Sequence, residues 1–340
     1  MELIDNKILK LRLRDTSTQL IKERIERSEV ISRTEDGVNE IVVYWGIDEV
    51  TQLNDLLNLT KTLPSPIAKE YKWPGLYKPF DHQRVTSEFL SITKRGFCFN
   101  EAGTGKTSSA LWAADYLMNK GKVKRVLIIC PLSIMYSAWQ ADIFNTCMHR
   151  TSQVCHGSKE KRQLIMSGEH EFIIINYDGV AIIKEDIKDA DFDLIIVDEA
   201  NAYKSTTTSR WKTLSKIVRP HTRVWMMTGT PASQSPEDAY GLAKLVCPER
   251  VPKFKTAWRD RVMYQVSRFR WLPRPTSKQE VFNALTPAIR FAKDECLDLP
   301  DVMYQTRTIE LTTQANKYYK ELKNQALIET AGEQISAVNA

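Results

Sequence analysis

Short apolar runs alternate with helical patterns from residue 80 to residue 246, and this alternation constrains the fold more than any other feature. The runs are nearly continuous, as in strands that helices cover on both faces. They lie at residues 97–99, 125–130, 153–155, 171–175, 193–197 and 223–227, with helices predicted at 106–118, 133–144 and 236–245. Strands alternating with helices predict an α/β fold with a doubly wound, mostly parallel sheet. In such a sheet the ligand site lies beyond the carboxyl ends of the strands.

A glycine-rich string, NEAGTGKT at residues 100–107, follows the first of these runs and precedes a helix. Glycines let backbone N–H groups approach phosphate oxygens, and the start of the helix favours an anion. The predicted ATP-binding residues of the string are Gly103, Thr104, Gly105, Lys106 and Thr107, with Lys106 on the β- and γ-phosphates and the Thr107 hydroxyl on Mg²⁺. Asn100 replaces the first glycine of the general pattern. A turn that binds nothing is the alternative, which the strand–turn–helix context disfavours.

Two adjacent carboxylates, Asp198 and Glu199, end the apolar run at 193–197. Asp198 suits a contact with Mg²⁺, and Glu199 is placed to orient and deprotonate an attacking water. A solvated Asp-Glu pair is common at strand ends, but the phosphate loop lies about ninety residues upstream, a normal separation for a catalytic pairing. We therefore predict Lys106, Asp198 and Glu199 as catalytic residues, with Thr107 and Asp198 holding Mg²⁺.

Taken in order, these motifs resemble the N-terminal RecA-like lobe of superfamily 2 helicases and translocases, closest to the Swi/Snf-type DNA translocases. The resemblance covers residues 80–246 and extends more loosely to about residue 325. Its further motifs are FDHQR with Gln83, VLIICP at 126–131 with Trp139, NYD at 176–178, DEAN at 198–201 and TGTP at 228–231. Leu299-Pro300 and a helix with Gln314 and Tyr318 look like the passage toward the family's second lobe.

The resemblance implies a RecA-like P-loop NTPase fold and assigns further roles. Gln83 would read adenine, and Pro131 would lie where the family touches the DNA backbone. Coupling of nucleotide state to movement is implied for Asn201, Thr228, Gly229 and Thr230. Asn201 stands where the family carries a histidine. Because asparagine hydrogen-bonds but does not titrate, this replacement bears on coupling rather than on nucleotide binding.

Positive charge is concentrated in residues 249–278, where nine basic side chains accompany two acidic ones; the net charge there is +7, against +6 for the whole chain. Five aromatic residues are interleaved: Phe254, Trp258, Tyr264, Phe269 and Trp271. Cations neutralise phosphates and aromatic rings stack on bases. The segment follows TGTP, where the family inserts elements over the DNA path, so we predict DNA contacts for Arg259, Arg261, Arg268 and Arg270. The alternative is a solvated helix face over buried aromatic rings.

Composition divides the chain into five predicted parts. They are a small mixed α+β module at 1–62, a proline-rich linker at 63–79, the RecA-like lobe at 80–248, the basic and aromatic insertion at 249–300, and a helical passage at 301–340. The first sixty residues carry a net charge of −4. A negative net charge disfavours strong binding to phosphates. A protein partner and a regulatory contact are equally compatible with this charge.

In the resembling family, a second lobe supplies arginines in a Q-x-x-R-x-x-R string that stabilise charge on the γ-phosphate. No such string follows Thr230. We expect a fragment of a longer helicase, one lobe of a motor whose second lobe acts in trans, or a standalone lobe, with low activity by itself. The loop sequence would fit a small, divergent bacteriophage helicase.

The expected function is ATP-dependent translocation on DNA, duplex preferred. The main alternative is a nucleotide-sensing DNA- or protein-binding module. An RNA helicase is disfavoured by TGTP and by the basic insertion, and a kinase would leave Gln83 and TGTP without a role.

The expected compartment is the cytoplasm (that of the host for a phage protein), without a membrane partner. Six scattered cysteines without a C-x-x-C pair indicate reduced thiols. No apolar run approaches the roughly 20 residues that span a bilayer, and the N-terminus lacks a signal core.

Overall fold

The computed structural model describes residues 1–33, 36–57, 62–232, 234–268, 270–297, 303, 305–325, 327–330 and 333–336. The chain forms two units, Met1–Leu297 and Asp298–Ala340. The second holds helix α15 (Thr313–Gln325) and the hairpin of β14 (Leu327–Thr330) and β15 (Glu333–Ser336). Leu299-Pro300 of the predicted passage lies outside the described residues. No described helix combines the length and apolarity that a membrane crossing requires.

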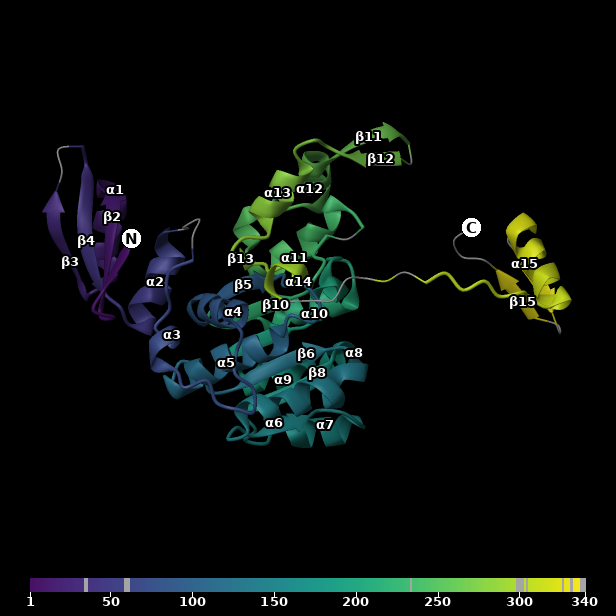
Figure 1. The fold of residues 1–340 in the computed structure, drawn as a ribbon, viewed down its shortest axis with the longest axis horizontal. Helices are drawn as coiled ribbons and strands as arrows, with labels where there is room; N and C mark the ends of the chain where they lie inside the picture. Colours follow the sequence, from purple (N-terminus) through teal and green to yellow (C-terminus); the bar gives the residue numbers. More distant parts are fainter. Residues whose placement is uncertain are drawn as a thin grey trace. The chain divides into compact units, whose positions relative to one another are not determined.

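Seven parallel strands form the central sheet of the first unit (Figure 1), in the order β13-β5-β10-β9-β6-β8-β7. Their bounds are β5 (Arg95–Cys98), β6 (Val126–Cys130), β7 (Ser152–Val154), β8 (Phe172–Asn176), β9 (Leu194–Val197), β10 (Arg223–Met227) and β13 (Ala288–Ile289). The first six coincide with the predicted apolar runs to within about two residues. The predicted RecA-like, doubly wound α/β sheet is confirmed.

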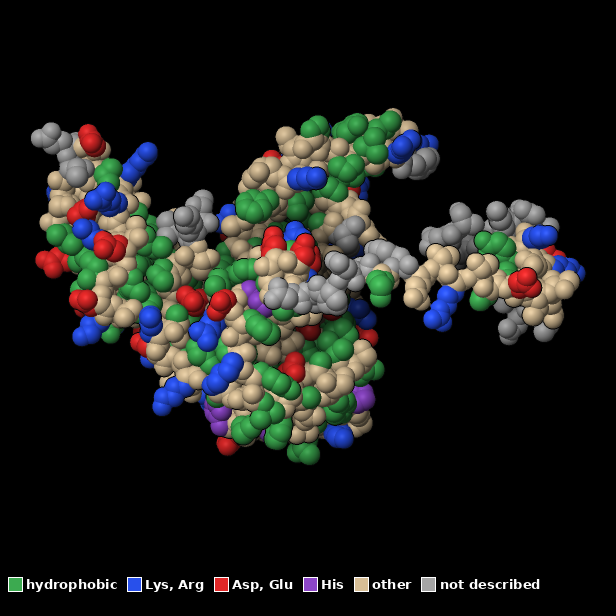
Figure 2. Space-filling model, in the orientation of Figure 1, with side chains coloured by type: hydrophobic (Ala, Val, Ile, Leu, Met, Phe, Trp, Pro, Cys, Tyr) green, Lys and Arg blue, Asp and Glu red, His purple; other side chains and the backbone are tan. Residues whose placement is uncertain are grey.

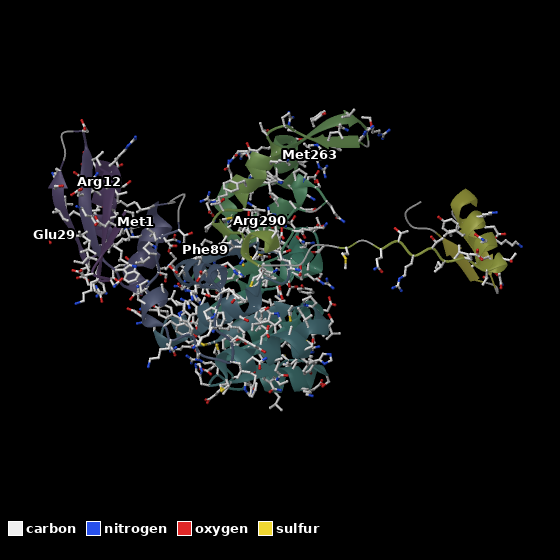
Figure 3. The ribbon with its side chains drawn as sticks, viewed as in Figure 1. Met1, Arg12, Glu29, Phe89, Met263 and Arg290 are labelled. Carbon is white, nitrogen blue, oxygen red and sulfur yellow. The ribbon has the colours of Figure 1, made fainter. Side chains whose placement is uncertain are left out.

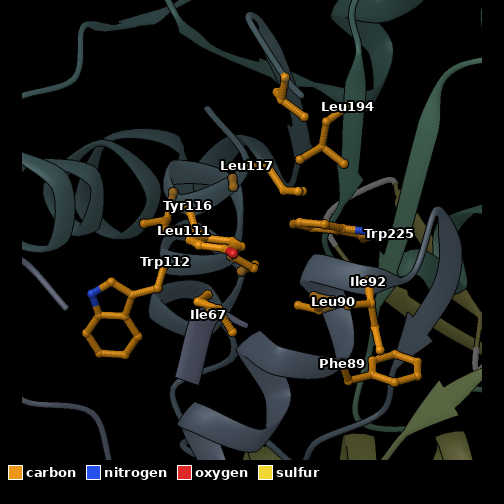
Figure 4. Packing of buried hydrophobic residues seen from close by; sticks show 14 of the residues in the cluster. Ile67, Phe89, Leu90, Ile92, Leu111, Trp112, Tyr116, Leu117, Leu194 and Trp225 are labelled. Atoms are coloured by element: carbon orange, nitrogen blue, oxygen red, sulfur yellow. The ribbon is translucent and has the colours of Figure 1, made fainter. Parts of the chain in front are cut away.

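Alternate residues of each strand face two separate hydrophobic cores, because successive side chains of a strand point to opposite faces. Ile128, Ile196 and Trp225 belong to one core, while their neighbours Ile129 and Val197 belong to the other. Both faces of these strands are therefore buried, which explains why the strands read as nearly continuous apolar runs. Figure 4 shows the first core, where Trp225 and Leu194 of the sheet meet Leu111 and Leu117 of α5 and Leu90 and Ile92 of α4.

Helices flank the sheet on both faces. They are α4 (Asp81–Ile92), α5 (Lys106–Asn119), α6 (Ala141–Cys147), α7 (Lys159–Met166), α8 (Tyr177–Ile182), α9 (Lys184–Ala190), α10 (Ser209–Ile217) and α11 (Ala239–Val246). Short turns intervene at η1 (Leu132–Ile134), η3 (Ala200–Tyr203), η4 (Pro236–Asp238) and η5 (Pro248–Arg250). The helix predicted at 133–144 is not continuous: η1 is followed by a π-helical turn, η2 (Met135–Gln140), and then by α6.

The first 57 residues form a mixed α+β module with an antiparallel sheet of order β1-β2-β4-β3. Its elements are β1 (Glu2–Ile4), β2 (Ile8–Arg14), α1 (Asp15–Arg24), β3 (Ser28–Arg33), β4 (Val38–Tyr44) and α2 (Ile47–Leu57). Its core is continuous with the first core of the central sheet.

The proline-rich segment at 63–79 is packed against the lobe and carries a short helix, α3 (Ile67–Glu70). Trp73 is buried and makes edge-to-face contacts with Tyr71 and with Trp112 of α5. The Trp112 indole N–H donates to the Pro74 carbonyl at 3.0 Å. The Trp45 indole N–H likewise donates to the Pro64 carbonyl at 2.7 Å. Indole N–H groups therefore hold this segment at Pro64 and at Pro74.

The basic stretch after α11 folds as two helices with a hairpin between them. They are α12 (Lys255–Val262), β11 (Met263–Ser267), β12 (Arg270–Pro273) and α13 (Ser277–Ala284). The chain then returns to the central sheet as β13 and ends this unit with α14 (Lys293–Cys296). In Figure 3, Met263 marks the base of the hairpin and Arg290 marks the return. β13 was not predicted from the sequence; it pairs Ala288 and Ile289 with Phe97 and Cys98 of β5.

Candidate nucleotide site and adjoining motifs

The predicted phosphate loop connects the end of β5 to the start of α5. Gly103 and Gly105 have φ angles of +84° and +74°, a backbone region that costs residues with a Cβ atom about 1–2 kcal/mol. A Cβ atom at Gly105 would also collide with the side-chain amide of Gln83. The second glycine of GTGKT is therefore required both by the turn and by the approach of α4.

Gln83 lies in the first turn of α4 and is bonded to the loop. Its Nε2 donates to the Thr104 carbonyl at 3.2 Å, and its Oε1 accepts the backbone N–H of Phe80 at 3.0 Å. The buried His82 ring donates to the same Thr104 carbonyl at 2.9 Å. His82 also stacks in parallel on the Phe80 ring, 59% exposed, with 5.8 Å between centroids. His82 was not identified from the sequence, where it is a lone histidine before the glutamine.

Lys106 and Asn100 occupy the interior of the loop. The Lys106 ammonium donates to the carbonyls of Asn100 at 2.8 Å and Glu101 at 3.1 Å. The fully buried Asn100 side chain donates to the Thr86 hydroxyl at 2.8 Å and accepts the backbone N–H of Phe291 at 3.0 Å. Asn100 thus connects the loop to α4 and to Phe291, just after β13, which a glycine at this position could not do.

Asp198 and Glu199 follow β9, beside β10 and β6 at the same end of the sheet. The Trp139 indole N–H donates to Asp198 Oδ2 at 3.0 Å, and the Glu199 backbone N–H donates to Oδ1 at 2.9 Å. Burial raises the pKa of the Asp198 carboxyl, while these two donors and Lys106 act to lower it. Glu199 is exposed and has a φ of +46°, a strained backbone angle of the kind that clusters at functional sites.

Trp139 and Tyr177 are further residues of this site whose roles the sequence did not show. Trp139, which the sequence placed in the same motif as Pro131, is fully buried and donates to Asp198. The Tyr177 hydroxyl donates to the Asp198 carbonyl at 2.7 Å. Pro131, the predicted DNA contact, is half-buried at the carboxyl end of β6.

Asn201 joins the DEAN and TGTP motifs. Its Nδ2 donates to the Thr230 carbonyl at 2.7 Å and lies 3.2 Å from the Thr228 hydroxyl. Gly229 packs against the phosphate loop, since a Cβ atom there would lie 3.7 Å from the Ala102 nitrogen. The structure thus brings the predicted coupling residues into one contact series that ends at the phosphate loop.

The chain offers oxygen ligands of the kind that Mg²⁺ prefers. Thr107 is half-buried in the first turn of α5, and Asp198 holds a carboxylate between two fixed donors. The glycines leave backbone N–H groups open to an anion at a helix of 14 residues. These donors fit a Mg-nucleotide.

The four arginines predicted to bind DNA divide into two pairs. Arg259 forms an ion pair with Glu237 at 2.7 Å and lies over the Trp271 ring, and Arg261 pairs with Glu280 at 2.6 Å. Arg268 and Arg270 lie at the turn of the β11–β12 hairpin, where Figure 2 shows basic side chains.

The interleaved aromatic residues differ in burial. Trp258 is fully buried, whereas Tyr264 is 41% exposed and Phe254 is 65% exposed. For Trp258 the alternative interpretation therefore holds, an aromatic ring buried beneath a solvated helix face. Phe269 lies outside the described residues.

A family model for the SNF2-related domain matches residues 47–339. The chain belongs to the SNF2-related domain family. The match agrees with the motif order and the sheet, so the RecA-like part is the N-terminal ATPase lobe of a Swi/Snf-type superfamily 2 protein. The family's nucleotide is ATP.

The SNF2-related chain is similar to parts of several much longer proteins. It is 25% identical over 268 residues to the Drosophila melanogaster SWI/SNF-related regulator of chromatin subfamily A containing DEAD/H box 1 homolog, covering 71% of this chain and 31% of that protein. It is 25% identical over 252 residues to the Bos taurus DNA annealing helicase and endonuclease ZRANB3, with coverages of 70% and 23%. The chain thus spans less than a third of each.

Two Sulfolobus solfataricus structures share the fold. The SWI2/SNF2 ATPase core in complex with dsDNA matches with a TM-score of 0.56 and 17% identity over 65% of this chain and 46% of that chain. The SWI2/SNF2 ATPase core domain matches with a TM-score of 0.53 and 18% identity over 76% of this chain and 54% of that chain. At this identity the likeness establishes the fold.

Proposed function

We propose that the chain is the first motor lobe of an ATP-dependent DNA translocase, which binds Mg-ATP and couples its hydrolysis to movement on duplex DNA. The observation that carries the proposal is the contact series from Gln83 through the phosphate loop to Gly229 and Asn201. A nucleotide sensor needs only the contacts between Gln83 and the phosphate loop. A motor also needs the contacts from the loop to Gly229 and Asn201, which can transmit a change at the phosphates to the TGTP motif.

Each residue has a defined task in this proposal. Lys106 neutralises phosphate charge, and Gln83 fixes the loop while its α4 turn meets the base. Asp198 and Thr107 hold Mg²⁺, which would polarise the γ-phosphate when bound. Glu199 accepts a proton from the attacking water at its carboxylate, where its exposed side chain is accessible to solvent.

Contact with DNA is proposed for the hairpin arginines, Arg268 and Arg270, and for the backbone near Pro131. The Sulfolobus relative bound to dsDNA supports duplex DNA as the partner. Arg259 and Arg261 already have carboxylate partners. We therefore assign them mainly to holding α12 in place, with a smaller share of the phosphate contact.

The test measures ATP hydrolysis with duplex DNA, single-stranded DNA and RNA, with and without a second lobe from a relative supplied in trans. We expect duplex DNA to stimulate most. Lys106→Ala should abolish ATP binding, and Glu199→Gln should lower turnover at least about 100-fold while ATP still binds. An unchanged rate for Glu199→Gln would contradict the catalytic assignment.

DNA binding is tested separately by the salt dependence of affinity. Reversing Arg268 and Arg270 to glutamate should weaken duplex binding and reduce the slope of log affinity against log salt by about two. Lys159→Glu with Lys161→Glu on α7 is the control and should leave the slope unchanged. An unchanged slope for the arginine variant would favour the alternative function, a nucleotide-sensing module that binds another protein.

A further inference from the structure

The return segment, residues 288–293, is built into the phosphate loop. β13 extends the sheet beside β5, so that Ile289 pairs with Cys98 immediately before the loop. The backbone pairing continues beyond the strands, because the Glu101 N–H donates to the Phe291 carbonyl at 3.0 Å. The Asn100 side chain accepts the Phe291 N–H at 3.0 Å. Two consecutive loop residues are thus fixed by a segment near the end of the basic insertion, after its hairpin and α13.

The Glu101 carboxylate binds two more residues of the same segment. It accepts the backbone N–H of Lys293 at 3.0 Å and pairs with Arg290 at 3.4 Å. The pKa of Glu101 is lowered, first by the Lys293 N–H and then by Arg290. Glu101 therefore forms an ion pair with Arg290 and accepts the backbone N–H of Lys293. The Lys293 ammonium is not part of either interaction.

The Lys293 side chain extends over the glycine face of the loop. A Cβ atom built on Gly103 would lie 3.6 Å from Lys293 Cε and 3.9 Å from its Nζ. Within the part of the chain that the structure describes, the ammonium has no ion pair, although Asp294 and Glu295 follow it in sequence. Glu295 is occupied with the Ala292 N–H at 3.1 Å. A cation is thus held beside the glycine whose open backbone the nucleotide phosphates would approach.

We propose that Lys293 is a second phosphate-binding cation of the nucleotide site, positioned in cis by the clamp between Glu101 and residues 290–293. Its ligand is the polyphosphate of a nucleoside di- or triphosphate. The proposal rests on the proposed function, since it requires that the loop binds a nucleotide. It also gives the insertion a second task, because the hairpin and the cation belong to one continuous stretch that joins the phosphate loop to the proposed DNA contact.

The experiment is equilibrium binding of ATP, ADP and adenosine to the full chain, measured by competition with a fluorescent nucleotide. Lys293→Ala should weaken ATP and ADP binding by about three- to tenfold and leave adenosine unchanged, because Lys293 is exposed and an exposed ion pair contributes modestly. Lys293→Arg should restore most of the affinity, and Lys293→Glu should weaken it further. Lys278→Ala on α13 removes an exposed lysine of the same insertion and should change nothing.

The outcomes separate this proposal from the function on which it rests. If the wild type binds no ATP, or Lys106→Ala binds as well as the wild type, the proposed function is wrong. If Lys106→Ala loses ATP while Lys293→Ala and Lys293→Glu bind it normally, only the role of Lys293 is overturned. A matched loss of adenosine affinity, or a lower melting temperature without nucleotide, would show that Lys293 merely supports the loop and would also overturn it.

Discussion

The indole N–H of Trp139 donates to the Asp198 carboxylate at 3.0 Å, and both side chains are buried. Trp139 lies on the π-helical turn η2, a rare geometry that is frequent at functional sites. With the Glu199 N–H on the other oxygen, both Asp198 oxygens are oriented by the chain itself. The direction of this carboxylate is therefore set before a metal ion binds.

Trp139→Phe should weaken Mg²⁺ binding, because it removes the donor while keeping most of the ring. Loss of such a supporting bond typically lowers metal affinity about 10- to 100-fold. The Mg²⁺ concentration needed for half-maximal nucleotide binding is the measurement. Trp112→Phe is the matched control, since Trp112 is also buried and donates to the Pro74 carbonyl. If the two variants shift the Mg²⁺ midpoint equally, the Asp198 contact has no special role.

Gly105→Ala should abolish tight nucleotide binding and lower the free energy of unfolding by about 1–2 kcal/mol from backbone strain alone. The added Cβ atom also collides with the Gln83 amide, which would have to move and give up its bond to the Thr104 carbonyl. Gly121→Ala is the control: its φ is +67°, but a Cβ atom there meets nothing within 4 Å. Calorimetry should show similar strain in both variants, and nucleotide affinity should fall in the first one only.

Asn201→Ala should leave ATP affinity unchanged and lower the stimulation of hydrolysis by DNA several-fold. The substitution removes the bonds to Thr228 and Thr230, through which a change at the loop would reach the TGTP motif. Asn201→His restores the family's residue and should retain stimulation. Equal stimulation in wild type and Asn201→Ala would remove Asn201 from the coupling role.

Glu88→Gln should stabilise the protein at pH 7–8. Burial raises the pKa of Glu88 above its ordinary value, although the Ser65 N–H partly opposes this. A raised pKa means that the folded state binds the proton more tightly, so the stability contribution is complete below the unfolded pKa and is lost as pH rises through the folded pKa. We expect a gain of a few tenths of a kcal/mol after solvent screening, vanishing below pH 4. Thermal unfolding across pH measures it, with the exposed Glu169→Gln as control.

Most strands of the lobe were predictable because they are nearly continuous apolar runs with both faces buried, as in Leu194–Val197. Local pattern failed where tertiary contacts decide the structure. β13 has two residues and forms because β5 offers a free edge, and η2 departs from an ordinary helix where Trp139 reaches Asp198. The nucleotide-binding residues were predicted from the spacing of their motifs. Lys293 was not, because the pairing of β13 with β5 brings it to the loop and no motif marks that pairing in the sequence.

The return of β13 also bears on how the protein is made. Ala288 pairs with Phe97, so the edge of β5 waits for a partner about 190 residues later in the chain. At about 5–20 residues per second, a ribosome needs about 10–40 s to supply that partner. Throughout this interval β5 lacks the partner on that edge, next to the phosphate loop, and an unpaired strand edge is a template for aggregation. A nascent-chain holdase that covers this edge should therefore raise the yield of folded protein more than one that acts after release.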